Sequence, residues 1–206
     1  MSQAQRPDFN SPEAVPAEWV ALARSRQREV HHLEHALSAL DRRDDRCDRI
    51  DVLVHTAAVA PGPAQALCGA MGEEQLARLP WLLVRGVILN REQQLFPAAR
   101  VLGLVVTEAR LQGDAYLLLW GLLELSRAQA MSGQLSRATE NLREAFSVLE
   151  EHPSDLLKVR ALLTMGMLYT QEGEHASAAD YNAEALQLSG IVTILFCGMV
   201  MAQYTV

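Results

Sequence analysis

The chain has 206 residues, of which 50% are hydrophobic and 5% aromatic, and its formal net charge is −7. The apolar residues suffice for a substantial core, and the excess of Leu and Ala over aromatic residues favours helix over strand. The acidic balance argues against nucleic acid and anionic membrane as partners, because both are bound through a positive field.

The three cysteines, Cys47, Cys68 and Cys197, are widely spaced and form no CxxC pair. An odd number without that spacing indicates neither a disulfide framework nor a zinc site, and it fits a reducing compartment. Residues 1–15 carry no apolar segment of the kind found in a secretory signal, and we expect a disordered lead there. The sequence therefore predicts a cytoplasmic protein.

From Pro16 onward, apolar residues fall on one stripe and polar residues fill the opposite face, which predicts a first long helix. The stripe contains Trp19, Ala23, Val30, Leu33, Leu37 and Leu40. The charged run at 41–49 is either a turn or the solvated first turn of a second helix that carries the apolar residues of 50–58. Pro61-Gly62-Pro63 ends this helix, and another helical stretch is predicted from 64 to 71. Residues 16–78 do not keep the spacing of the later chain, and we interpret them as divergent N-terminal helices or a cap.

A spacing of forty residues organises the rest of the chain. Three sets of residues recur at this spacing: Gly86, Ser126 and Gly166; Ala98, Ala138 and Ala178; and Leu82-Leu83, Leu122-Leu123 and Leu162-Leu163. A fixed period of this size is typical of a supersecondary unit that stacks on copies of itself. Small residues on both helices of a hairpin let the two backbones approach closely. The pattern predicts an all-α array of helical hairpins over residues 79–206.

Each unit is predicted to contain two helices joined by a tight turn. In the third unit the helices run from about 155 to 171 and from about 175 to 188, with Gly173 at the turn. The second unit repeats this arrangement around Gly133. The first unit has Gln93 at the equivalent position, where the others have glycine.

The third unit also has a recognisable order of side chains. The order is Leu162, Met165-Gly166, Tyr169, Gly173, Ala178, Tyr181 and Ala185-Leu186. It resembles the tetratricopeptide repeat, with the aromatic residue of the second helix displaced by one position. The second unit matches at Leu122, Leu125, Ser126, Gly133, Ala138, Leu142 and Ala145-Phe146, and the first keeps Leu82, Gly86, Ala98 and Leu102.

The forty-residue period is longer than the standard repeat and is similar to the extended variants of bacterial signalling and transcription regulators. The resemblance implies a right-handed α-α superhelix of three tetratricopeptide-like repeats and an unpaired helix of a fourth. It also implies that a peptide or protein partner binds in a concave groove lined by the first helix of each repeat. By phase, the groove candidates are Asn90, Arg91, Trp120, Arg127, Met131, Arg160, Met167 and Gln171.

Three arginines, one per unit, would then face the ligand. Their forked donors suit the carboxylates of an acidic segment or a chain terminus. In the alternative interpretation these arginines are solvated surface groups, and the N-terminal helices cover the apolar positions.

Metal and catalytic sites find little support in the sequence. His31, His32 and His35 stand close together, and the first and last of them share a helix face, but only two ligands with suitable spacing are visible. A solvated helix face is the favoured interpretation, and we predict no metal site and no cofactor. The chain has no GxSxG, no HExxH and no phosphate-cradling glycine loop, so we do not expect an enzyme.

Residues 191–206 contain no charged side chain. A repeat array normally ends on a helix with a polar outer face, so an apolar end is typical of an interface. Either two chains form a homodimer through this segment, or the array is truncated. Our first hypothesis for the function is a protein–protein interaction module. The alternative is a sensory or regulatory segment of a larger bacterial signalling or transcription regulator that is truncated at Val206.

Overall fold

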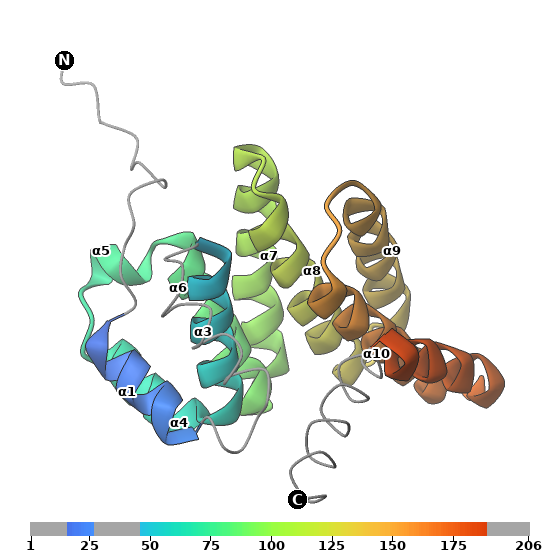
Figure 1. Ribbon diagram of the computed structural model, residues 1–206, viewed down its shortest axis with the longest axis horizontal. Coiled ribbons are helices and arrows are strands. Elements are labelled where there is room, and N and C mark those ends of the chain that lie inside the picture. The colour runs from blue at the N-terminus through green and yellow to red at the C-terminus, as the bar shows by residue number, and fades with distance from the viewer. Residues whose placement is uncertain (1–15, 27–45, 189–206) are drawn as a thin grey trace, which may run out of the picture. The chain divides into compact units, whose positions relative to one another are not determined.

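The computed structural model describes residues 16–26 and 46–188 (Figure 1). Within these ranges there are nine helices with defined bounds, a further helical segment at residues 175–188, and no strand. Consecutive helices pack as antiparallel pairs. The chain divides into two compact units, Met1–Glu92 and Gln93–Val206. The all-α prediction is confirmed.

The N-terminal unit contains α1 (Ala17–Arg26), α3 (Arg46–Val59), α4 (Pro61–Gly69), α5 (Glu73–Leu76) and α6 (Leu79–Arg91). Helix α3 contacts α1, α4 and α6 and is central to this unit. Trp19 of α1 meets Trp81 of α6 edge to face, with ring centroids 5.2 Å apart and 63° between the ring planes. Because both rings are buried, this pair ties the first helix of the unit to the last.

The predicted helices of this region are confirmed with shifted bounds. Helix α3 ends at Val59, before the prolines that are predicted to end it. Helix α4 begins at Pro61 instead of Ala64, because a first-turn residue needs no intrahelical acceptor for its backbone nitrogen. The sequence pattern does not predict α5, which is a single turn. Helix α6 belongs to the N-terminal unit, whereas the predicted domain boundary, at residue 78, precedes it.

The C-terminal unit contains α7 (Leu95–Gln112), α8 (Ala115–Met131), α9 (Leu135–Glu151) and α10 (Asp155–Glu172), followed by the helical residues 175–188. Helix α8 packs against α7 and α9, and α10 packs against α8 and α9. Packing from neighbour to neighbour is consistent with a helical repeat. Fully buried side chains of this core include Leu102, Leu117, Trp120, Leu142, Leu157 and Leu162.

The forty-residue period is visible in the backbone of the C-terminal unit. Gln93, Gly133 and Gly173 all have positive φ angles, of 61°, 81° and 83°. A helix begins two residues after each turn, at Leu95, Leu135 and residue 175. The predicted turns are confirmed, and Gln93 adopts the left-handed conformation that glycine adopts at the other two.

The N-caps of α8 and α10 repeat with the same period. The Asp114 side chain accepts a hydrogen bond from the backbone nitrogen of Leu117 at 3.1 Å. Forty residues later, the Ser154 hydroxyl oxygen accepts one from the backbone nitrogen of Leu157 at 3.4 Å. Each cap satisfies a backbone donor that has no acceptor inside its own helix.

Small residues mark the close approach within the third hairpin. A Cβ atom added at Gly166 of α10 would lie 2.5 Å from Oδ1 of Asn182 on the following helical segment. The equivalent alanines of the second helices, Ala98, Ala138 and Ala178, are all buried. The sequence argument for a close crossing is therefore confirmed at Gly166.

Three predictions fall outside the described residues. They concern the lead at 1–15, the part of the first long helix at 27–45 that carries His31, His32 and His35, and the uncharged segment at 189–206. Among the helices that the structure does describe, none combines the length and apolar character needed to cross a membrane.

Candidate functional site

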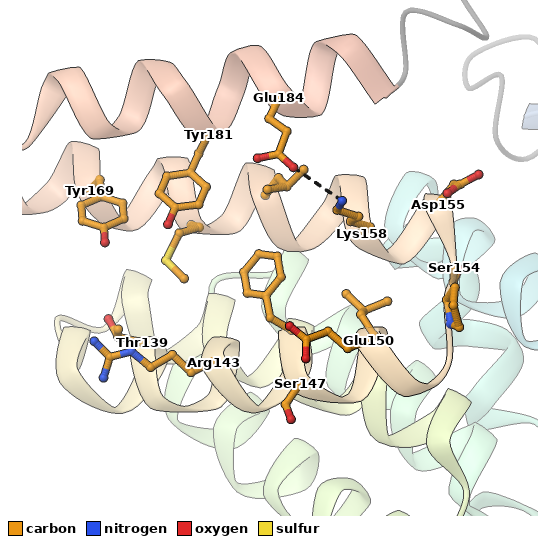
Figure 2. Close-up of a pocket in the computed structure, with 15 residues that line it drawn as sticks. Thr139, Arg143, Ser147, Glu150, Ser154, Asp155, Lys158, Tyr169, Tyr181 and Glu184 are labelled. Carbon is orange, nitrogen blue, oxygen red and sulfur yellow. Dashed lines mark ion pairs between the residues drawn. The ribbon is translucent and has the colours of Figure 1, made fainter.

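A groove of about 790 Å³ is present in the C-terminal unit (Figure 2). Helix α9 forms one wall, the helical residues 175–188 form the other, and α10 lies between them. The groove forms because α9 and residues 175–188 both lie beside α10, one on each side. Its side chains come from three successive helices, so the fold fixes their relative positions.

The floor of the groove is apolar. Leu149 of α9 and Leu162 and Met165 of α10 line it and are buried, with exposed fractions of 7%, 2% and 5%. Phe146 of α9 also lines the groove and is half-buried. A partly exposed aromatic ring beside a buried aliphatic floor is suited to receive apolar side chains from a ligand.

The two ends of the groove differ in charge. Figure 2 shows Arg143 of α9 at the end near Tyr169, and Glu150 and Asp155 toward the opposite end, near Ser154. The side chains of Arg143, Glu150 and Asp155 are exposed. A bound segment would therefore meet a cation at one end and two carboxylates at the other.

An ion pair joins α10 to one wall of the groove. Nζ of Lys158 on α10 lies 3.5 Å from Oε1 of Glu184 on the helical residues 175–188, and both side chains are about half exposed (Figure 2). Pairs with this exposure contribute at most about 1 kcal/mol to stability. A ligand that offers better partners can therefore separate these two groups at low cost.

Two stacked tyrosines close the basic end of the groove. The rings of Tyr169 and Tyr181 have centroids 5.3 Å apart and planes at 11°. Partial burial, and then the neighbouring Tyr169, raise the pKa of the Tyr181 hydroxyl. The hydroxyl therefore stays protonated at neutral pH and presents a hydrogen-bond donor as well as an acceptor.

The chemistry of this groove is that of binding. It offers apolar contacts, one guanidinium, one ammonium, carboxylates and hydroxyl groups, and its lining contains no histidine or cysteine. Among the described residues, no group of three or more His, Cys, Asp or Glu side chains is arranged to hold a metal ion.

None of the eight groove candidates from the sequence lines this groove. Arg160 of α10 instead has partners within the chain: its Nη1 donates to Oε1 of Glu124 on α8 at 3.0 Å. Its guanidinium carbon lies 4.5 Å from the ring centre of Trp120. Trp120 is fully buried and only 3% of the Glu124 side chain is exposed. The structure thus places Arg160 in an internal cluster with Trp120 and Glu124.

The remaining candidates of the C-terminal unit lie on the same two helices, α8 and α10. Arg127, Met131 and Met167 are half-buried and Gln171 is exposed. Nε of Arg127 is buried and has no hydrogen-bond partner within the described parts of the chain. Asn90 is buried and Arg91 is half-buried, and both belong to α6 of the N-terminal unit.

The residues that line the groove have a signal in the sequence. Phe146 and Tyr181 fall on the second helices of their units, at or next to the aromatic position of the repeat pattern. Because the resemblance assigns ligand contacts to the first helices, the sequence analysis does not count these aromatic residues among the groove candidates. The structure leaves room between the two second helices, and this space is not evident from the spacing of residues.

No protein-family model, no curated protein and no solved structure matches this chain. The tetratricopeptide resemblance therefore depends on the residues of the repeat units and on the packing of the helices.

Proposed function

We propose that this chain is a protein-interaction module, and that it holds an apolar segment of a protein partner in the groove between α9 and residues 175–188. The observation that carries the proposal is the groove itself, about 790 Å³ in volume, with an apolar floor and charged groups at both ends. The rim of the groove is largely polar, and an apolar centre within a polar rim is the usual arrangement of a protein–protein interface.

The proposed architecture is a tetratricopeptide-like array in a right-handed superhelix. The support for it is the repetition of turns and N-caps at forty residues and the packing of each helix on its neighbours. Arrays of this kind present extended surfaces to other molecules, which agrees with an interaction role.

The groove is a better candidate than the predicted surface on the first helices. On that surface the Arg160 guanidinium already binds the Glu124 carboxylate and covers the Trp120 ring. A ligand carboxylate there would have to compete with an almost fully buried internal one. In the groove, by contrast, Phe146 is accessible at the side of an aliphatic floor.

The charges indicate which partner segment fits. Its central side chains are apolar and contact Phe146, Leu149 and Met165. An acidic group lies toward Arg143, and a basic group lies toward Glu150 and Asp155, because opposite charges at the two ends fix the direction of binding.

The test compares two surface substitutions of the same kind on different faces. A peptide is selected from a random display library against the full chain, and its affinity is measured by fluorescence anisotropy for the wild type, Ser147→Arg and Gln171→Arg. Ser147 lines the groove, Gln171 belongs to the predicted face of the first helices, and both are exposed. We expect Ser147→Arg to weaken binding about tenfold or more, equivalent to about 1.4 kcal/mol, and Gln171→Arg to leave it unchanged.

If Gln171→Arg weakened binding and Ser147→Arg did not, the binding surface would lie on the first helices and the groove proposal would be wrong. Equal affinity of all three proteins would place the peptide elsewhere. Circular dichroism of each variant checks that the helices are intact.

A further inference from the structure

Helix α7 has an exposed apolar stripe that no packing within the described part of the C-terminal unit explains. Phe96, Leu104 and Leu111 are 73%, 55% and 76% exposed. At 100° per residue these three side chains fall within a sector of about 80°, opposite to the buried face of the helix. That buried face contains Ala98, Leu102, Val105, Val106 and Ala109. The stripe runs along nearly the whole helix.

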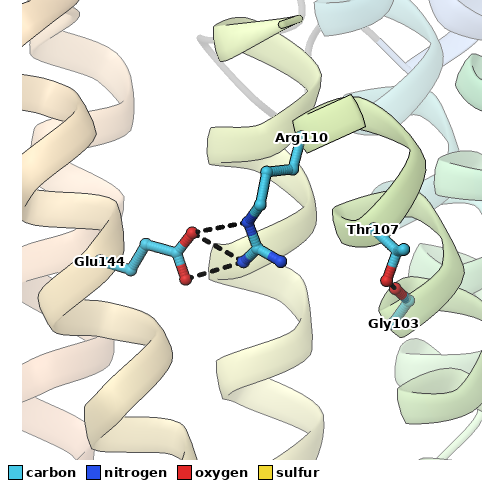
Figure 3. Close-up of polar contacts among 4 residues, drawn as sticks. All are labelled: Gly103, Thr107, Arg110 and Glu144. Carbon is cyan, nitrogen blue, oxygen red and sulfur yellow. Dashed lines mark hydrogen bonds and ion pairs between the residues drawn. The ribbon is translucent and has the colours of Figure 1, made fainter. Parts of the chain in front are cut away.

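The orientation of α7 is set by its buried face, which packs on α8. Beside the stripe, Arg110 binds Glu144 of α9 with two nitrogens: Nη2 lies 2.7 Å from Oε1 and 2.9 Å from Oε2, and Nε lies 3.2 Å from Oε1 (Figure 3). The two side chains are 53% and 36% exposed, so this pair adds at most about 1 kcal/mol to that packing. The stripe lies on the side of the helix opposite to its buried face.

Gly103 lies about halfway along α7, but at 100° per residue it falls about 20° outside the sector of the stripe and about 100° from Leu104. A Cβ added there would meet no atom within 4 Å, and its backbone is that of an ordinary helix. Figure 3 shows the Thr107 hydroxyl turned back onto the Gly103 carbonyl, to which it donates at 2.9 Å. Gly103 is therefore not part of the stripe.

Four exposed residues of α7 are spaced almost symmetrically along the helix about Leu104. Phe96 and Leu111 lie at nearly equal distances on either side of it, and Arg100 and Glu108 lie four residues before and four residues after it. In an antiparallel pair of identical α7 helices, Leu104 meets its own copy and Phe96 meets Leu111 of the other chain. Arg100 then lies opposite Glu108 of the other chain. A two-fold axis requires this self-complementarity of one surface.

We propose that this chain forms a homodimer through the exposed face of α7, packed antiparallel on α7 of a second copy. The stripe and the Arg100–Glu108 complementarity both point to this partner. The interface is separate from the peptide groove and uses a different segment from the uncharged residues 191–206. Because one helix of 18 residues is about 27 Å long, the interface is small and the dimer dissociates on dilution.

The experiment measures the solution mass of the full chain by light scattering across a dilution series from about 300 μM to about 1 μM, the range in which small interfaces dissociate. We expect the mass to rise from 22.7 kDa toward twice that value as the concentration increases. Leu104→Lys places two ammonium groups at the axis and keeps the chain monomeric. Leu163→Lys, at a 47% exposed leucine of α10, is the matched control and leaves the mass curve unchanged.

A charge exchange tests the antiparallel register. Arg100→Glu or Glu108→Arg alone brings like charges together and weakens the dimer at least about tenfold, and the double variant restores it. A wild-type chain that stays at 22.7 kDa throughout overturns the proposal. So does a dimer that survives Leu104→Lys, which would place the interface elsewhere, or a double variant that stays monomeric.

Discussion

Replacing Arg160 with alanine tests the energetic role of the cluster that joins α8 and α10. The substitution removes the cation that lies 3.0 Å from the Glu124 carboxylate and 4.5 Å from the centre of the Trp120 ring. The Glu124 side chain is 3% exposed, so after the substitution its charge is compensated only by water that enters the space left by the arginine.

The magnitude follows from burial. Breaking a fully buried ion pair by removing one partner costs about 3–5 kcal/mol. Arg160 is 23% exposed and Glu124 has further contacts. Both facts reduce the expected cost of breaking the pair to about 2 kcal/mol. Loss of the guanidinium from the Trp120 ring adds about 1 kcal/mol. We expect Arg160→Ala to lower the free energy of unfolding by about 3 kcal/mol.

The assay is urea denaturation followed by circular dichroism, for the wild type, Arg160→Ala, Glu124→Gln and the double variant. The double-mutant cycle isolates the interaction between the two side chains, and we expect a coupling of about 1.5 kcal/mol or more. The tryptophan emission, to which Trp19 and Trp81 contribute a constant part, should shift to longer wavelength in Arg160→Ala, because the covered Trp120 ring gains contact with water. A coupling under about 0.5 kcal/mol would refute the reasoning, since independent sites give values of that size.

Three further predictions use the same unfolding measurement. Gln93→Gly should raise the free energy of unfolding by about 1 kcal/mol, because Gln93 holds a φ of +61° that favours glycine; a loss of stability would mean that its side chain is needed. Gly166→Ala should lower it by about 1 kcal/mol through a clash with Asn182, but should raise it by a similar amount in an Asn182→Ala background; a gain in both backgrounds would contradict the close approach. The pKa of Tyr181 is raised in the folded state, so the stability that its protonated hydroxyl contributes is complete below the ordinary pKa of 10.0 and is lost as the pH rises through the folded-state pKa. Above pH 10.0 the free energy of unfolding of Tyr181→Phe should therefore fall less than that of the wild type, and an equal fall in both proteins would contradict this.

The helices were predictable because their signals are local. Glycine at the turns, small residues at the crossings and proline at the helix starts act through the backbone of their own or adjacent residues. For this reason the bounds of α10 and the positive φ of Gly133 and Gly173 agree with the sequence pattern. Gln93 shows that the period holds even where the residue type does not, since it adopts the conformation of its two glycine equivalents.

The surfaces were not predictable in the same way. Arg160 occupies a position where the repeat pattern implies a ligand contact, yet Glu124, in the preceding repeat unit, supplies its partner. The spacing of residues within either helix does not predict this pair, because the pair depends on how α8 and α10 pack against each other. The groove is a similar case, since its walls come from the second helices of two different units.

By itself, the sequence determined that the chain is all-α, where its turns fall and that its units repeat every forty residues, because these properties follow from backbone preferences and apolar periodicity within short stretches. The tertiary structure alone decided which side chains are used internally and which remain accessible. That decision depends on contacts between helices separated by tens of residues, which bury Trp120 beneath Arg160 and leave Phe146 and the stripe of α7 exposed to solvent.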